Sequence, residues 1–139
     1  MRSRLIYLLL LALVIFPTTV HGVELGDMHV VKGIAALERG DDQTALTEFQ
    51  TFLTARGKSE LAHEVRFLAA RAALNTGKIQ QSLDYLTDLE ARLPEIGDFI
   101  LTLRAQAYRQ LHTWAASLEA WKTFLERYDD SPLRKDAAF

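Results

Sequence analysis

The chain has 139 residues, of which 49% are hydrophobic and 24% are charged. This composition excludes a collagen-like, low-complexity or wholly disordered chain, and the length suits one domain. A formal net charge of −2 gives no basic surplus, so nucleic acid is not an expected partner. The absence of cysteine excludes disulfides, thiolate metal sites, thiol nucleophiles and a lipid-bearing N-terminal cysteine.

Residues 1–22 have the layout of a secretory signal peptide. Two arginines near the start supply positive charge, residues 5–16 form an uncharged apolar run, and Gly22 ends a small-residue cleavage site. A membrane-spanning helix needs about 20 apolar residues, so a retained anchor is the weaker alternative. We therefore predict a periplasmic protein whose mature chain, residues 23–139, has no stable membrane anchor.

Apolar residues recur at helical spacing along the mature chain, and no stretch alternates with the two-residue period of a strand. Breaks fall at Gly40, at Gly57–Ser59 with Ser59 as an N-cap, at Gly77, and before Pro94 and Pro132. The pattern predicts an all-α fold with helices near 27–39, 43–55, 60–76, 79–92, 96–111 and 114–127, and another that begins near 132.

The predicted turns recur at a nearly constant interval. Gly77 lies 37 residues after Gly40, and His112 takes the equivalent place 35 residues later. Short loops predict that consecutive helices are antiparallel neighbours. Helix pairs with a period of about 34 residues are typical of tetratricopeptide repeats.

Residues at fixed places in these units resemble the tetratricopeptide repeat (TPR) family. In the first unit, the small, small, turn-glycine, alanine and aromatic positions are filled by Gly33, Ala36, Gly40, Ala45 and Phe49. The second unit matches more loosely, with Ala70, Ala73, Gly77, Ser82, Leu86 and a closing Pro94. In the third, the same places hold Ala105, Tyr108, Ser117 and Trp121, and His112 replaces the turn glycine. The resemblance implies a right-handed superhelical solenoid of antiparallel helix pairs over residues 23–139. It would hold about three repeats and the start of a fourth after Ser131, so that the domain is incomplete at its C-terminus.

Three segments are similar to the helical N-terminal region of periplasmic soluble lytic murein transglycosylases: Phe67–Ala73, Leu93–Ile100 and Phe124–Arg134. The last also resembles periplasmic adaptors of outer-membrane assembly and cell-division coordination, with Asp129 where a proline is commoner. The enzymes' catalytic domain has a glutamate followed by serine, and no glutamate here precedes a serine. The resemblance therefore implies a non-catalytic scaffold or binding module, with a protein–protein adaptor of the cell envelope as the alternative.

The sequence offers no catalytic or metal-binding motif. The acidic pairs Asp41-Asp42 and Asp129-Asp130 lie at predicted helix boundaries, where capping explains them better than acid–base catalysis. The four histidines lack metal-ligand spacing, and no glycine-rich phosphate loop occurs. We expect no catalytic residue, metal or cofactor.

Binding is the function that this pattern favours, because helical solenoids present an extended concave face lined by the first helix of each unit. The family's concave positions give as binding candidates Phe67, Arg71, Asn75, Phe99, Gln106, Arg109 and Gln110, with Val30, Ile34, Leu37, Glu64, Leu74 and Thr102 beside them. The polar members would suit a peptide carboxylate or a glycan, although an ordinary solvated helix face fits them equally well. The expected partner is a protein or peptide of the cell envelope, or peptidoglycan.

The two tryptophans admit two interpretations. Trp114 and Trp121 share one predicted helix face with Leu118 and Leu125, which favours the core for both over a sugar-stacking platform. Trp114, at the helix start, is the better candidate for partial exposure.

Overall fold

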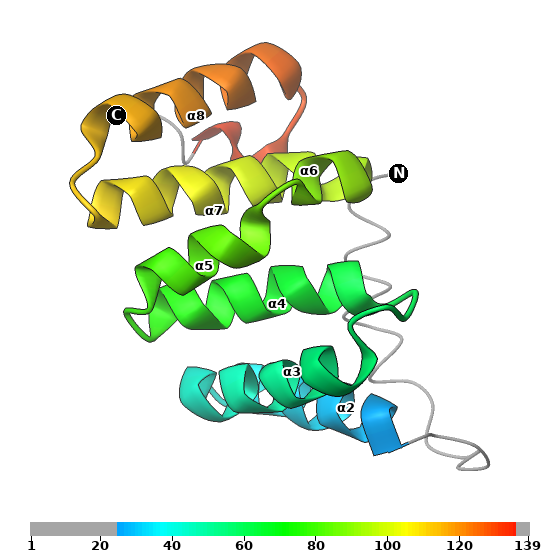
Figure 1. The fold of residues 1–139 in the computed structure, drawn as a ribbon. Helices are drawn as coiled ribbons and strands as arrows, with labels where there is room; N and C mark the ends of the chain where they lie inside the picture. Colours follow the sequence, from blue (N-terminus) through cyan, green and yellow to red (C-terminus); the bar gives the residue numbers. More distant parts are fainter. Residues whose placement is uncertain (1–24, 136–139) are drawn as a thin grey trace.

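The computed structural model describes residues 25–135, so the predicted signal peptide lies outside the described part. These residues form an all-α fold without strands, which confirms the predicted class (Figure 1). The helices are α2 (Leu25–Glu38), α3 (Asp42–Arg56), α4 (Ala62–Asn75), α5 (Ile79–Leu86), α6 (Leu89–Arg92), α7 (Gly97–Gln110) and α8 (Trp114–Arg127). Short 3-10 helices η1 (Pro94–Ile96) and η2 (Pro132–Lys135) precede α7 and follow α8.

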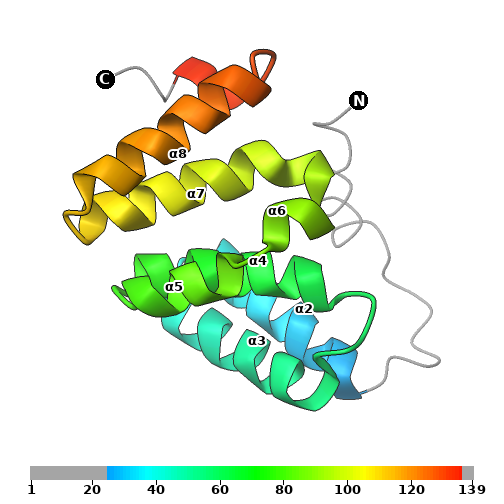
Figure 2. The same ribbon diagram turned by 45° about the horizontal axis from the view of Figure 1, so that its top comes forward.

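Helices that follow one another in sequence pack against each other. In Figure 1, α2 and α3 lie at the bottom, α4 and α5 in the middle, and α7 and α8 at the top. Figure 2 shows the same order from a second direction, with α6 between α5 and α7. The core is accordingly divided into three clusters of buried side chains along the stack.

The turns within the three helix pairs share one backbone conformation. Gly40, Gly77 and His112 have positive φ angles of 74°, 76° and 57°. In each turn, the residue after the one with positive φ donates its N–H to the carbonyl of the residue five positions earlier, at 2.9, 2.8 and 2.9 Å. The prediction that His112 replaces a turn glycine is confirmed.

Close packing within a pair depends on small residues in the first helix. A side chain at Gly33 would overlap the ring of Phe49, which is fully buried. In the third pair, Trp121 shares a buried cluster with Ala105 of the first helix. The small and aromatic positions thus complement each other in volume.

The predicted helix over 79–92 is wrong in one respect, because the chain breaks it at Thr87 and Asp88. Asp88 has a positive φ of 56°, which separates α5 from α6. The break releases carbonyls that guanidinium groups of other helices bind. Arg66 donates to the Thr87 carbonyl at 2.6 Å, and Arg104 donates to the Leu86 carbonyl at 2.9 Å.

Ser59 is not the N-cap of the next helix, contrary to the prediction. The helix α4 begins at Ala62 with Leu61 as the N-cap residue and no side-chain cap. The Ser59 carbonyl accepts from the Ala62 N–H at 3.1 Å, so a backbone turn occupies the place of a capping hydroxyl. Asp41, in contrast, caps α3 as expected by accepting from the Thr44 N–H at 3.1 Å.

The α8 stripe is only partly buried, which corrects the expectation for Trp114 and Leu118. Trp121 is 8% exposed, whereas Trp114 is 61% and Leu118 54% exposed. Leu46 has the place in α3 that Leu118 has in α8, and it is buried with α4 residues in the first core cluster. The described residues include no full helix that covers α8 as α4 covers α3.

The segment after α8 is fixed to the start of α7. Ser131 donates its hydroxyl hydrogen to the buried Asp98 carboxylate at 2.7 Å, and a side chain at Gly97 would overlap the Tyr128 hydroxyl. Where another helix is predicted to begin near 132, the described chain forms the 3-10 helix η2. The remainder of that predicted helix lies outside the described residues.

Candidate functional site

A groove of about 520 Å³ lies along the first helices of the three pairs. Its walls come from α2, α4 and α7, and η1 and η2 add one residue each. The lining residues are Ile34, Leu37, Glu38, Glu64, Phe67, Leu68, Arg71, Asn75, Ile96, Phe99, Thr102, Leu103, Gln106 and Leu133. Residues distant in sequence are therefore brought to one continuous surface.

The structure brings most of the sequence-derived candidates together in this groove. Among the seven principal ones, those that line it are Phe67, Arg71, Asn75, Phe99 and Gln106. Arg109 and Gln110 do not line it and lie exposed in the last turn of α7. Of the accompanying positions, Leu74 is buried in the second core cluster, and Val30 packs against the first.

Sequence reasoning missed Glu38, Leu68, Ile96, Leu103 and Leu133 as groove residues. Leu68 and Leu103 stand one residue after the positions of Phe67 and Thr102, where helical spacing also permits contact with the groove. Ile96 and Leu133 come from short 3-10 helices, which helical periodicity does not reveal. Leu133 follows the Ser131-Pro132 pair, and that pair is the one local signal in the sequence that an element after α8 lines the groove.

The groove is predominantly apolar, with a few polar groups. Phe67 and Phe99 are partly buried against the second core cluster. Two of the polar side chains are occupied within the fold, since Asn75 donates to Asp42 at 3.1 Å and Thr102 donates to a backbone carbonyl at 2.8 Å. The continuous polar strip suggested by the sequence is thus replaced by a surface suited to apolar side chains.

Glu64 is a polar groove residue with one carboxylate oxygen that is both buried and unpartnered. Its Oε2 atom is buried and has no hydrogen-bond partner among the described residues. A buried carboxylate oxygen without a donor costs free energy, on the order of 1–3 kcal/mol or more for a charged group. A hydrogen-bond donor that reaches this oxygen would remove that cost.

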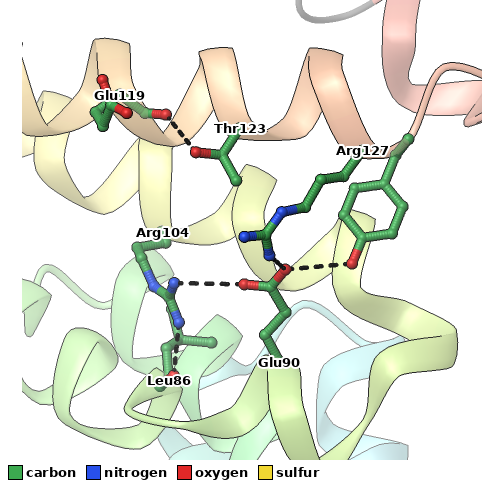
Figure 3. A network of polar contacts seen from close by, with 7 residues as sticks. Leu86, Glu90, Arg104, Glu119, Thr123 and Arg127 are labelled. Atoms are coloured by element: carbon green, nitrogen blue, oxygen red, sulfur yellow. Dashed lines mark hydrogen bonds and ion pairs between the residues drawn. The ribbon is translucent and has the colours of Figure 1, made fainter.

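A second hollow of about 630 Å³ lies between α5, α6, α7 and the end of α8. Glu90 is the centre of its polar network (Figure 3). The Glu90 carboxylate accepts from Arg127 at 3.0 Å and from the Tyr128 hydroxyl at 3.3 Å, and it lies 3.8 Å from Arg104. Because these groups satisfy one another, Glu90, Arg104 and Arg127 offer a ligand little unpaired charge.

Burial raises the pKa of Tyr128 above its ordinary value, and the nearby Glu90 carboxylate adds to this shift. A phenol with a raised pKa stays neutral at physiological pH and continues to donate its hydrogen bond. This network therefore serves to hold α6, α7 and α8 together.

The described residues contain no group of three or more histidine or acidic side chains placed to hold a metal ion. None of the helices in residues 25–135 is long and apolar enough to span a bilayer.

No family model matches the chain, and no curated protein or solved structure shows significant similarity to it.

Proposed function

We propose that this chain is a non-catalytic, periplasmic, TPR-like binding module that holds a peptide segment of a cell-envelope protein in the groove. The peptide carries apolar side chains for the Phe67 and Phe99 region and an N–H donor, such as a lysine or arginine side chain, for Glu64. The observation that carries this proposal is the apolar groove with one unpartnered, buried carboxylate oxygen.

The right-handed superhelical solenoid is part of the same proposal. It is supported by packing between sequence neighbours and by the three turns with equal backbone conformation at Gly40, Gly77 and His112. In such a solenoid the first helices line the concave face. That arrangement accounts for a groove formed by α2, α4 and α7.

A peptide fits the groove better than the glycan strands of peptidoglycan. Sugars are recognised by many hydrogen-bonding groups, whereas most groove residues are aliphatic or aromatic. Apolar pockets with few convergent polar groups are typical of sites that bind apolar side chains. The envelope adaptor is therefore favoured over the murein scaffold.

Photo-crosslinking tests this function. The photoreactive amino acid p-benzoylphenylalanine in place of Phe67 should crosslink to a segment of an envelope protein, which mass spectrometry identifies. The same probe in place of Thr51, an exposed residue of α3 outside the groove, should give no such adduct. Cosedimentation with purified murein sacculi without a protein adduct at position 67 would contradict the proposal.

A charge-reversal pair then tests the role of Glu64. A synthetic peptide with the crosslinked sequence should bind Glu64→Lys at least about tenfold more weakly than wild type, a loss of about 1.4 kcal/mol. Glu60→Lys makes the same charge change at an exposed residue outside the groove and should bind normally. Equal affinities for the two variants would show that Glu64 does not contact the peptide.

A further inference from the structure

Exposed apolar side chains gather on the two outermost helices of the described stack. On α2, Met28 is 40% and Val31 is 45% exposed, and on α8 Trp114 and Leu118 are more than half exposed. The other exposed large hydrophobic residues, Leu61 and Leu111, lie at the turns next to α4 and α7. Two apolar end faces thus stand apart from the groove.

The exposed face of α2 corresponds to the face that α4 and α7, the first helices of the next two pairs, bury. Val65 of α4 follows Met28 by 37 residues, and Ile100 of α7 follows Val65 by 35. Both are buried, Val65 in a cluster with α3 residues and Ile100 in a cluster with α5 residues. Met28 is therefore placed to pack on the second helix of another unit.

The correspondence between α2 and the later helices α4 and α7 extends further along α2. Val31 has the place of Leu68, which packs against the first cluster, and of Leu103, which belongs to the second. Ala35 has the place of Ala72 and Ala107, which are fully buried. A small side chain there permits the close approach of two helices.

The α8 face is the complementary one. Leu118 has the place of Leu46 in α3 and of Leu83 in α5. Leu46 is buried in one cluster with Val65, and Leu83 packs against the cluster that contains Ile100. Trp114 stands one turn before Leu118, in the place of Ile79, which packs on the same cluster as Leu83.

We propose that the α2 face of one copy of this chain packs on the α8 face of a second copy, head to tail, as α4 packs on α3. The proposal commits to a second copy because this chain itself carries both halves of an interface that it uses twice internally. Such a heterologous contact leaves one free face at each end, so further copies add in the same direction. At each contact between two copies, the first helices of one copy would continue those of the other. The groove that these helices line would thus extend from copy to copy.

Sedimentation velocity on the chain purified from an exporting host tests this proposal over a range of concentrations. The average mass of the wild type should rise with concentration. Leu118→Asp blocks the α8 face and Val31→Asp blocks the α2 face, so each variant alone should remain monomeric. An equimolar mixture of the two should double in mass to a dimer and go no further, because one intact face of each kind remains.

The matched control is Ala115→Asp, which adds the same charge to α8 next to Trp114. Its equivalents Gln43 and Gln80 are exposed, so position 115 lies outside the packing face and assembly should equal that of the wild type. The substituted side chains are well exposed, and circular dichroism should show wild-type helicity. If Val31→Asp loses wild-type helicity, Met28→Asp replaces it as the α2-face variant. If Leu118→Asp does, Trp114→Asp replaces it as the α8-face variant.

Three results would overturn head-to-tail packing. The first is a wild-type chain that stays monomeric at every concentration. The second is self-association of either single-face variant, which would mean that like faces pair. The third is a mixture that remains monomeric.

Discussion

Ser82 and Ser117 occupy equivalent places in successive helix pairs and make the same hydrogen bond. The Ser82 hydroxyl donates to the Ala70 carbonyl at 2.7 Å, and the Ser117 hydroxyl donates to the Ala105 carbonyl at 2.9 Å. Donor and acceptor both shift by 35 residues. Each bond ties the second helix of a pair to the first at a buried point.

Replacement of either serine by alanine should lower the free energy of unfolding by about 1 kcal/mol, the usual net contribution of one hydrogen bond. Alanine fits the site, because Ala45 fills the equivalent place in the first pair and is fully buried. Urea denaturation measures the change. Thr51→Ala removes an exposed hydroxyl bond to a backbone carbonyl and should cost less than about 0.5 kcal/mol. Equal losses of unfolding free energy in the serine variants and in Thr51→Ala would show that the buried hydroxyl bonds contribute no more than the exposed one.

The two tryptophans form a natural pair for a test of burial. Trp121→Ala should cost about 3–5 kcal/mol, because it empties a space in the third cluster. Trp114→Ala should cost less than about 1 kcal/mol, since its side chain is mostly in solvent. The intrinsic fluorescence of each single-tryptophan variant supplies a second measurement. Emission should be blue-shifted when Trp121 alone remains and red-shifted when Trp114 alone remains.

The positive φ of His112 predicts that His112→Gly stabilises the fold. A side chain in the left-handed region costs about 1–2 kcal/mol, and glycine offsets part of that gain through the entropy of the unfolded chain. We expect a net increase of about 0.5–1 kcal/mol in the free energy of unfolding. Gly77→Ala, at the equivalent position, should change stability in the opposite direction. A destabilised His112→Gly variant would mean that the contact between the His112 and Trp114 rings, whose centroids lie 5.5 Å apart, outweighs the backbone strain.

The raised pKa of Tyr128 predicts a loss of stability at alkaline pH. Above the ordinary tyrosine pKa of about 10, the unfolded chain ionises while the folded state keeps its proton. Unfolding then releases a proton, so the free energy of unfolding falls as pH rises through this range. Tyr128→Phe should make this alkaline decline shallower and leave the slope near neutral pH unchanged. An identical alkaline slope in the variant would exclude Tyr128 as its source.

Sequence periodicity was sufficient for the helices other than those predicted over 79–92 and from 132, and for the turns at Gly40, Gly77 and His112, because these depend on local residues. His112 could be identified as a turn residue from its distance to Gly77 alone. The break between α5 and α6 could not, since the exposed carbonyls are bound by Arg66 and Arg104 from other helices. Contacts of that kind depend on the tertiary arrangement.

The groove residues also divide into those that local spacing predicts and those that depend on tertiary contacts. Helical spacing predicts which residues of one helix share a face, and the concave positions implied by the repeat-family resemblance include Phe67, Arg71 and Gln106, which line the groove together. It does not reveal that Leu133 completes the wall, nor that Trp114 lacks the cover that its equivalent Ile79 has. An amphipathic pattern identifies a face, whereas burial depends on the neighbour.

Packing between sequence neighbours also shapes how the chain reaches its structure. Because α2 packs on α3 and each later helix packs on the one before it, the contacts close short loops, and chains of this kind fold fast. A helix pair can form as soon as its own residues have left the ribosome or a translocation channel. The pair of α2 and α3 would then serve as the template on which α4 docks, so that the fold grows from its N-terminal end in the order of synthesis.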